Sequence, residues 1–155
     1  MWSSLWTDSF FRFRMTADNK KECDSDEVDY LSPTDDVRRR QLERVANVLP
    51  RLGVPRTYRG FEATIAAVWL VLEDEDCLRM VTTRIYAKVA QLCGQTRYAA
   101  ERNIRTVVKR AWDCNPAYLS EIAGYPISTQ PIPSEFIDML ATDAMRFTSQ
   151  GQIPT

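Results

Sequence analysis

Residues 60–73 constrain the fold of this chain most strongly, because they are apolar on almost every side of a helix. Phe61, Ile65, Val68 and Leu72 recur at the three- and four-residue spacing of an α-helix. A helix with so little polar surface has to be surrounded by other elements. No part of the sequence alternates apolar and polar residues as a half-buried strand does. The sequence therefore predicts an all-α bundle, without a sheet, around a central helix at 60–73.

Further amphipathic segments supply the rest of this bundle of about six helices. The expected helices, besides 60–73, are residues 35–49, 84–92, 96–112, 116–122 and 134–147, with a short helical turn at 76–81. Three prolines predict an extended connector at 125–133. The side chains assigned to the core include Trp69, Trp112, Phe136, Leu140, Ala144 and Phe147.

The charge distribution divides the chain into regions. Residues 16–36 hold eight acids and two lysines, whereas residues 79–112 hold eight basic residues and a single acid, Glu101. Such asymmetry is typical of an acidic tail beside a nucleic-acid surface, although a solvated linker beside an arginine-rich helix has the same composition. We expect an acidic, disordered tail with an aromatic-rich start at 1–34, a helical domain at 35–148 and a disordered C-terminus at 149–155.

Several functional classes are disfavoured by what the sequence lacks. It contains no histidine, which removes Ser-His and Cys-His nucleophile pairs, and we expect no enzyme activity. Its four cysteines form no C-x-x-C pair, so we expect reduced thiols of a cytoplasmic protein and neither a metal nor a cofactor. No apolar run reaches the length of a membrane span, and no membrane partner is expected.

The segments 84–92 and 96–112 together resemble a helix-turn-helix. Between them lies Cys93-Gly94-Gln95-Thr96, in which Gly94 can adopt the left-handed backbone that a tight turn needs. Ala90, four residues earlier, is small enough for the two helices to pack closely. A glycine turn between helices is common, so this spacing alone does not establish DNA binding.

The outer face of 96–112 strengthens that interpretation. The candidate DNA-contacting residues are Arg97, Tyr98, Glu101, Arg102, Arg105 and Lys109. Arg102 can form a bidentate pair with guanine, Glu101 can accept from the cytosine amino group, and the other basic residues suit phosphates. The alternative is an ordinary solvated face on which Glu101 and Arg105 form an i,i+4 ion pair worth a few tenths of a kcal/mol.

Residues from about 41 to 147 resemble the carboxy-terminal effector domain of the stage 0 sporulation protein A family, the sporulation regulators of Gram-positive endospore formers. The matching landmarks are Gly53-Val54-Pro55, Arg59-Gly60-Phe61, Tyr86-Ala87-Lys88-Val89-Ala90, Glu101-Arg102-Asn103-Ile104-Arg105, Ala111-Trp112, Gly124-Tyr125 and Pro133-Ser134-Glu135-Phe136-Ile137. They follow the family's order and spacing over about two thirds of the chain.

This resemblance implies a helical effector domain of winged-helix-like class that binds double-stranded DNA, with two copies head to tail, as a homodimer, on tandem sites. In the family, an Arg-Val-Glu-Arg run on the recognition helix reads bases. The corresponding residues here are Ala99-Ala100-Glu101-Arg102. Glu101 and Arg102 thereby inherit base-reading roles, whereas Ala99 removes one arginine contact. Our hypothesis is that Arg97 or Tyr98 compensates from the preceding turn.

The family's receiver domain has no counterpart in this sequence, which leaves its regulation open. One hypothesis is that the acidic stretch 18–36 folds over the basic helix and mimics DNA, and the other is a simple solvated tail. A rival function is a protein-interaction module that pairs with a full-length regulator or with RNA polymerase. Ala99 and the acidic tail favour this rival slightly, and the basic stripe that runs to Lys109 disfavours it.

Overall fold

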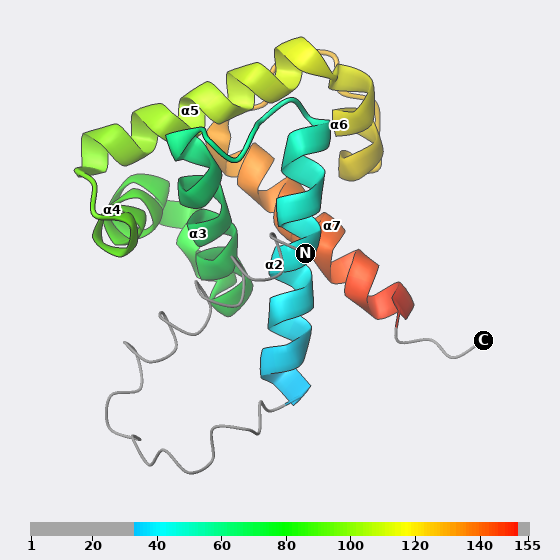
Figure 1. Ribbon diagram of the computed structural model, residues 1–155, viewed down its shortest axis with the longest axis horizontal. Helices are drawn as coiled ribbons and strands as arrows, with labels where there is room; N and C mark the ends of the chain where they lie inside the picture. The colour runs from blue at the N-terminus through cyan, green and yellow to red at the C-terminus, as the bar shows by residue number, and fades with distance from the viewer. Residues whose placement is uncertain (1–32, 152–155) are drawn as a thin grey trace.

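The computed structural model describes residues 33–151, in which every regular element is helical. The α-helices are α2 (Pro33–Arg51), α3 (Arg59–Glu73), α4 (Ala87–Cys93), α5 (Arg97–Cys114), α6 (Pro116–Ala123) and α7 (Pro133–Gly151) (Figure 1). The prediction of an all-α bundle of about six helices is confirmed. Our expectations for residues 1–32 and 152–155 lie outside the described residues.

Helix α3 is the centre of the bundle, as its composition predicts. Every residue from Ala63 to Val71 is buried, and α3 contacts α2, α4, α5 and α7. Trp69 lies in the core with 6% of its surface exposed, while Trp112 is half-buried and packs against the core from α5. Figure 1 shows α5 running across one end of α3, over the layer formed by α2, α3 and α7.

Helices α2 and α7 pack against each other through polar as well as apolar side chains. The buried amide of Gln41 donates to Oγ1 of Thr148 at 3.2 Å, and Nε of Arg44 donates to Oδ2 of Asp143 at 2.9 Å. These pairs join elements that are distant in sequence. Because buried polar groups are costly without partners, they fix the register of the two helices.

The assignment of Phe147 to the core is wrong. Its side chain is 46% exposed, whereas Phe136, Leu140 and Ala144 on the same helix are buried. Helical spacing does continue the inner face of α7 to Phe147, but the neighbour that α2 supplies there is the Arg44 guanidinium, 4.8 Å from the ring centroid. Phe147 therefore stacks against a cation at the edge of the bundle.

The connection from α3 to α4 also differs from the prediction. A 3-10 helix covers Glu75–Met80, where a short turn was expected, and a π-helix follows at Val81–Tyr86. The segment 84–92 is thus not one α-helix, since its first turn belongs to the π-helix and α4 begins at Ala87. Ile85 and Val89 are buried all the same. A π-helix has a wider turn than an α-helix, but apolar residues at i and i+4 do not distinguish the two. This explains why 84–92 was wrongly predicted as one α-helix.

Candidate nucleic-acid interface

A tight turn joins α4 to α5 and sets the direction of α5. Gly94 has φ +68° and ψ +37°, the left-handed conformation expected from the sequence. The backbone amide of Gln95 donates back to the carbonyl of Ala90 at 2.9 Å and closes the end of α4. Thr96 then caps α5, because its Oγ1 accepts a hydrogen bond from the amide of Ala99 at 3.0 Å. A helix-turn-helix is therefore present.

The inner face of α5 is fixed against the core. The buried residues of this face are Ala100, Ile104, Val107, Val108 and Ala111. Gly60 allows a close crossing of α3 and α5, since a Cβ at this position would lie 2.5 Å from the carbonyl oxygen of Asn103. At the other end of α5, Nε of Arg110 donates to the carbonyl of Gly53 at 2.8 Å. Helix α5 is therefore held along its length.

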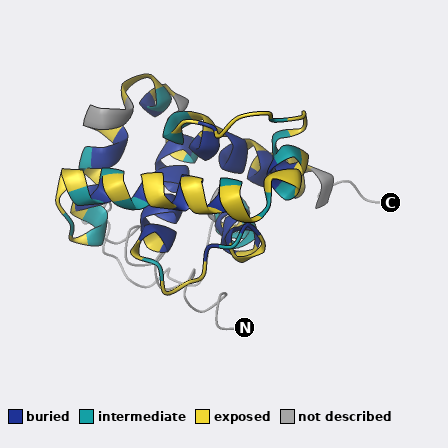
Figure 2. Cartoon of the chain, turned by 90° about the horizontal axis from the view of Figure 1, so that it is seen from above, coloured by how far each residue is buried: buried dark blue, intermediate teal, exposed yellow. Residues whose placement is uncertain are grey.

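The predicted contact residues all lie on the outer side of α5. Figure 2, viewed from above, shows α5 crossing the near side of the bundle with exposed residues toward the viewer. Tyr98 is 72% exposed, Arg97, Arg102, Arg105 and Lys109 are exposed, and Glu101 is half-buried. We call this set of six residues the α5 outer face. Its formal charge is +3, from four basic residues and one acid.

Ion pairs on the α5 outer face restrict some side chains. Nη2 of Arg105 donates to Oε2 of Glu101 at 2.5 Å, which is the i,i+4 pair considered from the sequence. Nζ of Lys109 pairs with Oδ2 of Asp113 at 3.0 Å. Among the described residues, none forms an ion pair or a side-chain hydrogen bond with the guanidinium of Arg102. Arg102 thus presents its full donor set to solvent.

Two further contacts shape the first turn of α5. The guanidinium of Arg97 lies 5.3 Å from the centroid of the Tyr98 ring. Nδ2 of Asn103 donates to Oε1 of Gln95 at 3.2 Å and ties the turn to the body of α5. Glu101 also acts on Tyr86, the last residue of the π-helix: burial, reinforced by the charge of Glu101, raises the pKa of Tyr86. Nothing in the sequence pattern marks Gln95 as a functional residue, because its position depends on Asn103 eight residues later.

A pocket of about 350 Å³ opens beside this turn. Its lining residues are Arg56, Thr57, Tyr58, Arg59, Phe61, Glu62, Cys93 and Gln95. Two of them, Arg56 and Arg59, come from the segment before and at the start of α3 and were not among the predicted site residues. Among the side chains that the structure describes, no three from Cys, Asp or Glu gather where they could hold a metal ion. The described residues also include no helix long and apolar enough to cross a membrane.

Residues 45–144 match the protein-family model described as "Sporulation initiation factor Spo0A C terminal". The match covers 100 of the 155 residues and includes the helix-turn-helix and the whole of α3 and α5. This family comprises the DNA-binding effector domain of a sporulation regulator, and it is not an enzyme family. The chain therefore belongs to the Spo0A C-terminal family and is a DNA-binding transcription regulator domain.

Proposed function

We propose that the domain binds duplex DNA sequence-specifically by placing the α5 outer face in the major groove. This proposal rests on one observation: Arg102, at the centre of the face, is exposed, and its guanidinium has no partner among the described residues. The opposite side of α5 is buried against α3, so the domain presents Arg102 from a rigid helix. A guanidinium held in this way suits the N7 and O6 acceptors of guanine.

The other residues of the face divide into base-reading and phosphate-binding groups. Glu101 is suited to accept from the cytosine amino group, with Arg105 holding its carboxylate in place. Arg97, Arg105 and Lys109 supply charge for phosphates, which gives affinity and salt dependence. On binding, Lys109 exchanges the Asp113 carboxylate for a phosphate, a small cost because exposed ion pairs are weak.

Arg97 and Tyr98 supply the contact that an arginine at the position of Ala99 makes in the family. This part of the proposal is supported by the guanidinium lying over the ring, in the first turn of α5. The ring limits the freedom of the Arg97 side chain while both groups stay accessible. The first turn of a recognition helix is the part that reaches base edges.

The proposed assembly on DNA is based on the resemblance to the family. We expect two copies to lie head to tail on tandem sites, and a contact with RNA polymerase would then couple binding to transcription. Such a protein acts with the chromosome in the cytoplasm. Analytical ultracentrifugation with a duplex carrying one or two sites measures the stoichiometry. Two copies on the double site and one on the single site is the expected result.

Fluorescence-anisotropy titrations test the DNA-binding proposal. A duplex with the family's operator and a scrambled duplex of equal length are titrated at several salt concentrations with wild type and Arg102→Ala. We expect the wild type to prefer the operator, and the variant to lose about 1–3 kcal/mol of that discrimination. The matched control is Arg79→Ala. Arg79 is also exposed but lies past the far end of α3, whose 15 residues span about 22 Å.

The outcomes separate the candidate functions. Equal, salt-sensitive binding of wild type to both duplexes would contradict sequence-specific reading but keep DNA binding. No binding to either duplex at low salt would contradict the proposal and favour the protein-interaction module. A loss of discrimination in Arg79→Ala equal to that in Arg102→Ala would show that α5 is not the reading element.

A further inference from the structure

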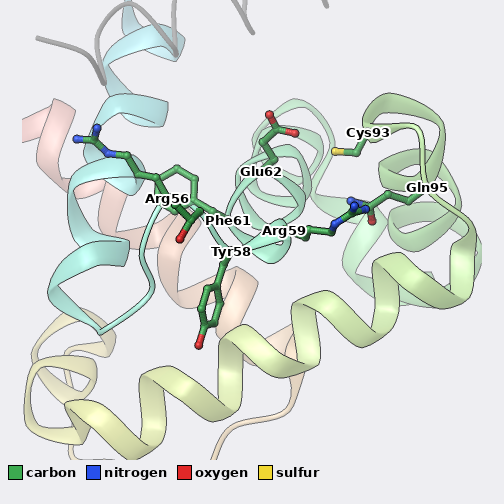
Figure 3. Close-up of a pocket in the computed structure, with 8 residues that line it drawn as sticks. Arg56, Tyr58, Arg59, Phe61, Glu62, Cys93 and Gln95 are labelled. Atoms are coloured by element: carbon green, nitrogen blue, oxygen red, sulfur yellow. The ribbon is translucent and has the colours of Figure 1, made fainter.

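The pocket beside the helix-turn-helix is lined by hydrogen-bond donors from two separate parts of the chain. Arg59 begins α3, and Gln95 lies in the turn that begins α5. Figure 3 shows the Arg59 side chain extending across the pocket toward Gln95, whereas Arg56 points away from the other lining side chains. Arg59 is exposed, and no described residue forms an ion pair or side-chain hydrogen bond with it.

The hydrogen bonds of Gln95 determine which of its atoms is left for a ligand. Its Oε1 accepts from Nδ2 of Asn103 at 3.2 Å, so the side-chain NH₂ is the group that remains available. An arginine guanidinium has only donors. Arg59 and Gln95 therefore offer donors alone, and a ligand between them has to be rich in acceptors.

The position of the pocket limits what that ligand is. Gln95 immediately precedes the Thr96 cap and the first turn of α5, which carries Arg97 and Tyr98. On the other side of the pocket, the Arg110 guanidinium lies over the Tyr58 ring, with its central carbon 5.6 Å from the ring centroid. The pocket thus lies alongside the α5 outer face, where a backbone strand flanking the major groove passes when α5 enters it.

From these observations we infer that Arg59 and Gln95 form a binding site for a phosphate of the DNA backbone. This inference rests on the proposed function and extends it to residues outside α5. Arg59 adds affinity and fixes the angle at which α5 enters the groove, because phosphate contacts position a protein while base contacts specify sequence. Glu62, the one acid of the pocket, opposes phosphate binding and limits the affinity.

The salt dependence of Arg59→Gln provides the first test. Full-length wild type and variant are titrated with the operator duplex and with the scrambled duplex. We expect the variant to lose affinity for both by the same factor, and its slope of log K against log salt to be shallower by about 0.9, the contribution of one phosphate. Arg79→Gln, the matched control, keeps the wild-type slope. An unchanged slope for Arg59→Gln would overturn the inference.

A duplex series with single methylphosphonate linkages tests the assignment at one phosphate. We expect one linkage at which neutralisation lowers the DNA affinity of wild type but not that of Arg59→Gln. The phosphate at that linkage is then the partner of Arg59. Equal effects on both proteins at every linkage would contradict the inference. Glu62→Gln should tighten binding to both duplexes at low salt, a gain that misfolding cannot produce, and an absent gain counts against the site.

Inorganic phosphate at constant ionic strength distinguishes a backbone phosphate from a free one. We expect inorganic phosphate to displace DNA from wild type and from Arg59→Gln equally readily. Selective displacement from wild type would assign the pocket to a free phosphate instead. If wild type binds neither duplex at low salt, the proposed function fails. If wild type prefers the operator through Arg102, but Arg59→Gln has the same affinity and salt dependence as Arg79→Gln, only the phosphate inference fails.

Discussion

Gly60 of α3 lies directly against the backbone carbonyl of Asn103 in α5. A Cβ at Gly60 would lie 2.5 Å from that oxygen, and it would also collide with Cγ2 of Val107. The two helices therefore cross at a distance that only glycine allows. Asn103 in turn holds the turn residue Gln95, so this crossing also positions the start of α5.

Gly60→Ala should destabilise the domain by about 1–3 kcal/mol, the usual cost of overpacking a core. One of the two obstacles is backbone, which a side-chain rotation cannot relieve, so α5 itself has to move, and DNA affinity should fall as well. Urea denaturation and anisotropy measure the two effects. Gly94→Asn is the control, because Gly94 has open space around it and asparagine tolerates a positive φ. A smaller loss for Gly60→Ala than for this control would refute the close-crossing argument.

Thr96→Ala should cost about 1 kcal/mol of unfolding free energy, because it removes the side-chain acceptor that caps α5. Thr96→Ser keeps that acceptor and should remain close to wild type. Chemical denaturation followed by far-UV circular dichroism compares the three proteins. Equal stability of the alanine and serine variants would mean that the cap contributes nothing measurable.

Asp143→Ala should destabilise the domain by about 2 kcal/mol. The side chain of Asp143 is 10% exposed, it accepts two hydrogen bonds from Arg44, and hydrogen bonds to charged groups are stronger than neutral ones. Asp113→Ala breaks the exposed pair with Lys109 and should change stability by less than about 0.5 kcal/mol. Thermal denaturation ranks the two variants, and a reversed order would contradict this account.

Glu101→Gln should raise affinity for scrambled DNA and lower the preference for the operator. The substitution removes the one acid of the α5 outer face and releases Arg105 for phosphates. It also removes the acceptor proposed to read cytosine, so discrimination falls by about 1–3 kcal/mol. Anisotropy on both duplexes separates the effects. Unchanged discrimination would leave Glu101 with a purely structural role.

Cys77 should react with iodoacetamide much more slowly than Cys114 in the folded protein. Burial, with the nearby charge of Asp74 adding to it, raises the pKa of the Cys77 thiol, and Cys114 is exposed. A raised pKa means less thiolate at a given pH, so labelling of Cys77 should accelerate as pH increases. Peptide mass spectrometry measures both rates, and in denaturant they should converge. Equal rates in the folded state would show that Cys77 is not protected.

Features that depend on local spacing could be predicted from the residues alone. Apolar residues at helical intervals identified α3 as the central helix, and Gly94 marked the turn because glycine adopts a positive φ at no steric cost. The sequence also predicted that the stripe from Tyr98 to Lys109 lies on one face of its helix, since residues three and four apart share a helix face. The exposure of that stripe is as expected, and its role on DNA stays a prediction.

The remaining features depend on contacts between residues that are distant in sequence. Phe147 has the spacing of a core residue, yet its exposure is set by where α2 places Arg44. The π-helix before α4 leaves nearly the same apolar spacing as an α-helix, so periodicity could not reveal it. Arg59 and Gln95 are 36 positions apart and meet in one pocket because α3 and α5 cross closely at Gly60. Helical periodicity is a local property, whereas a crossing is fixed only when both surfaces pack together.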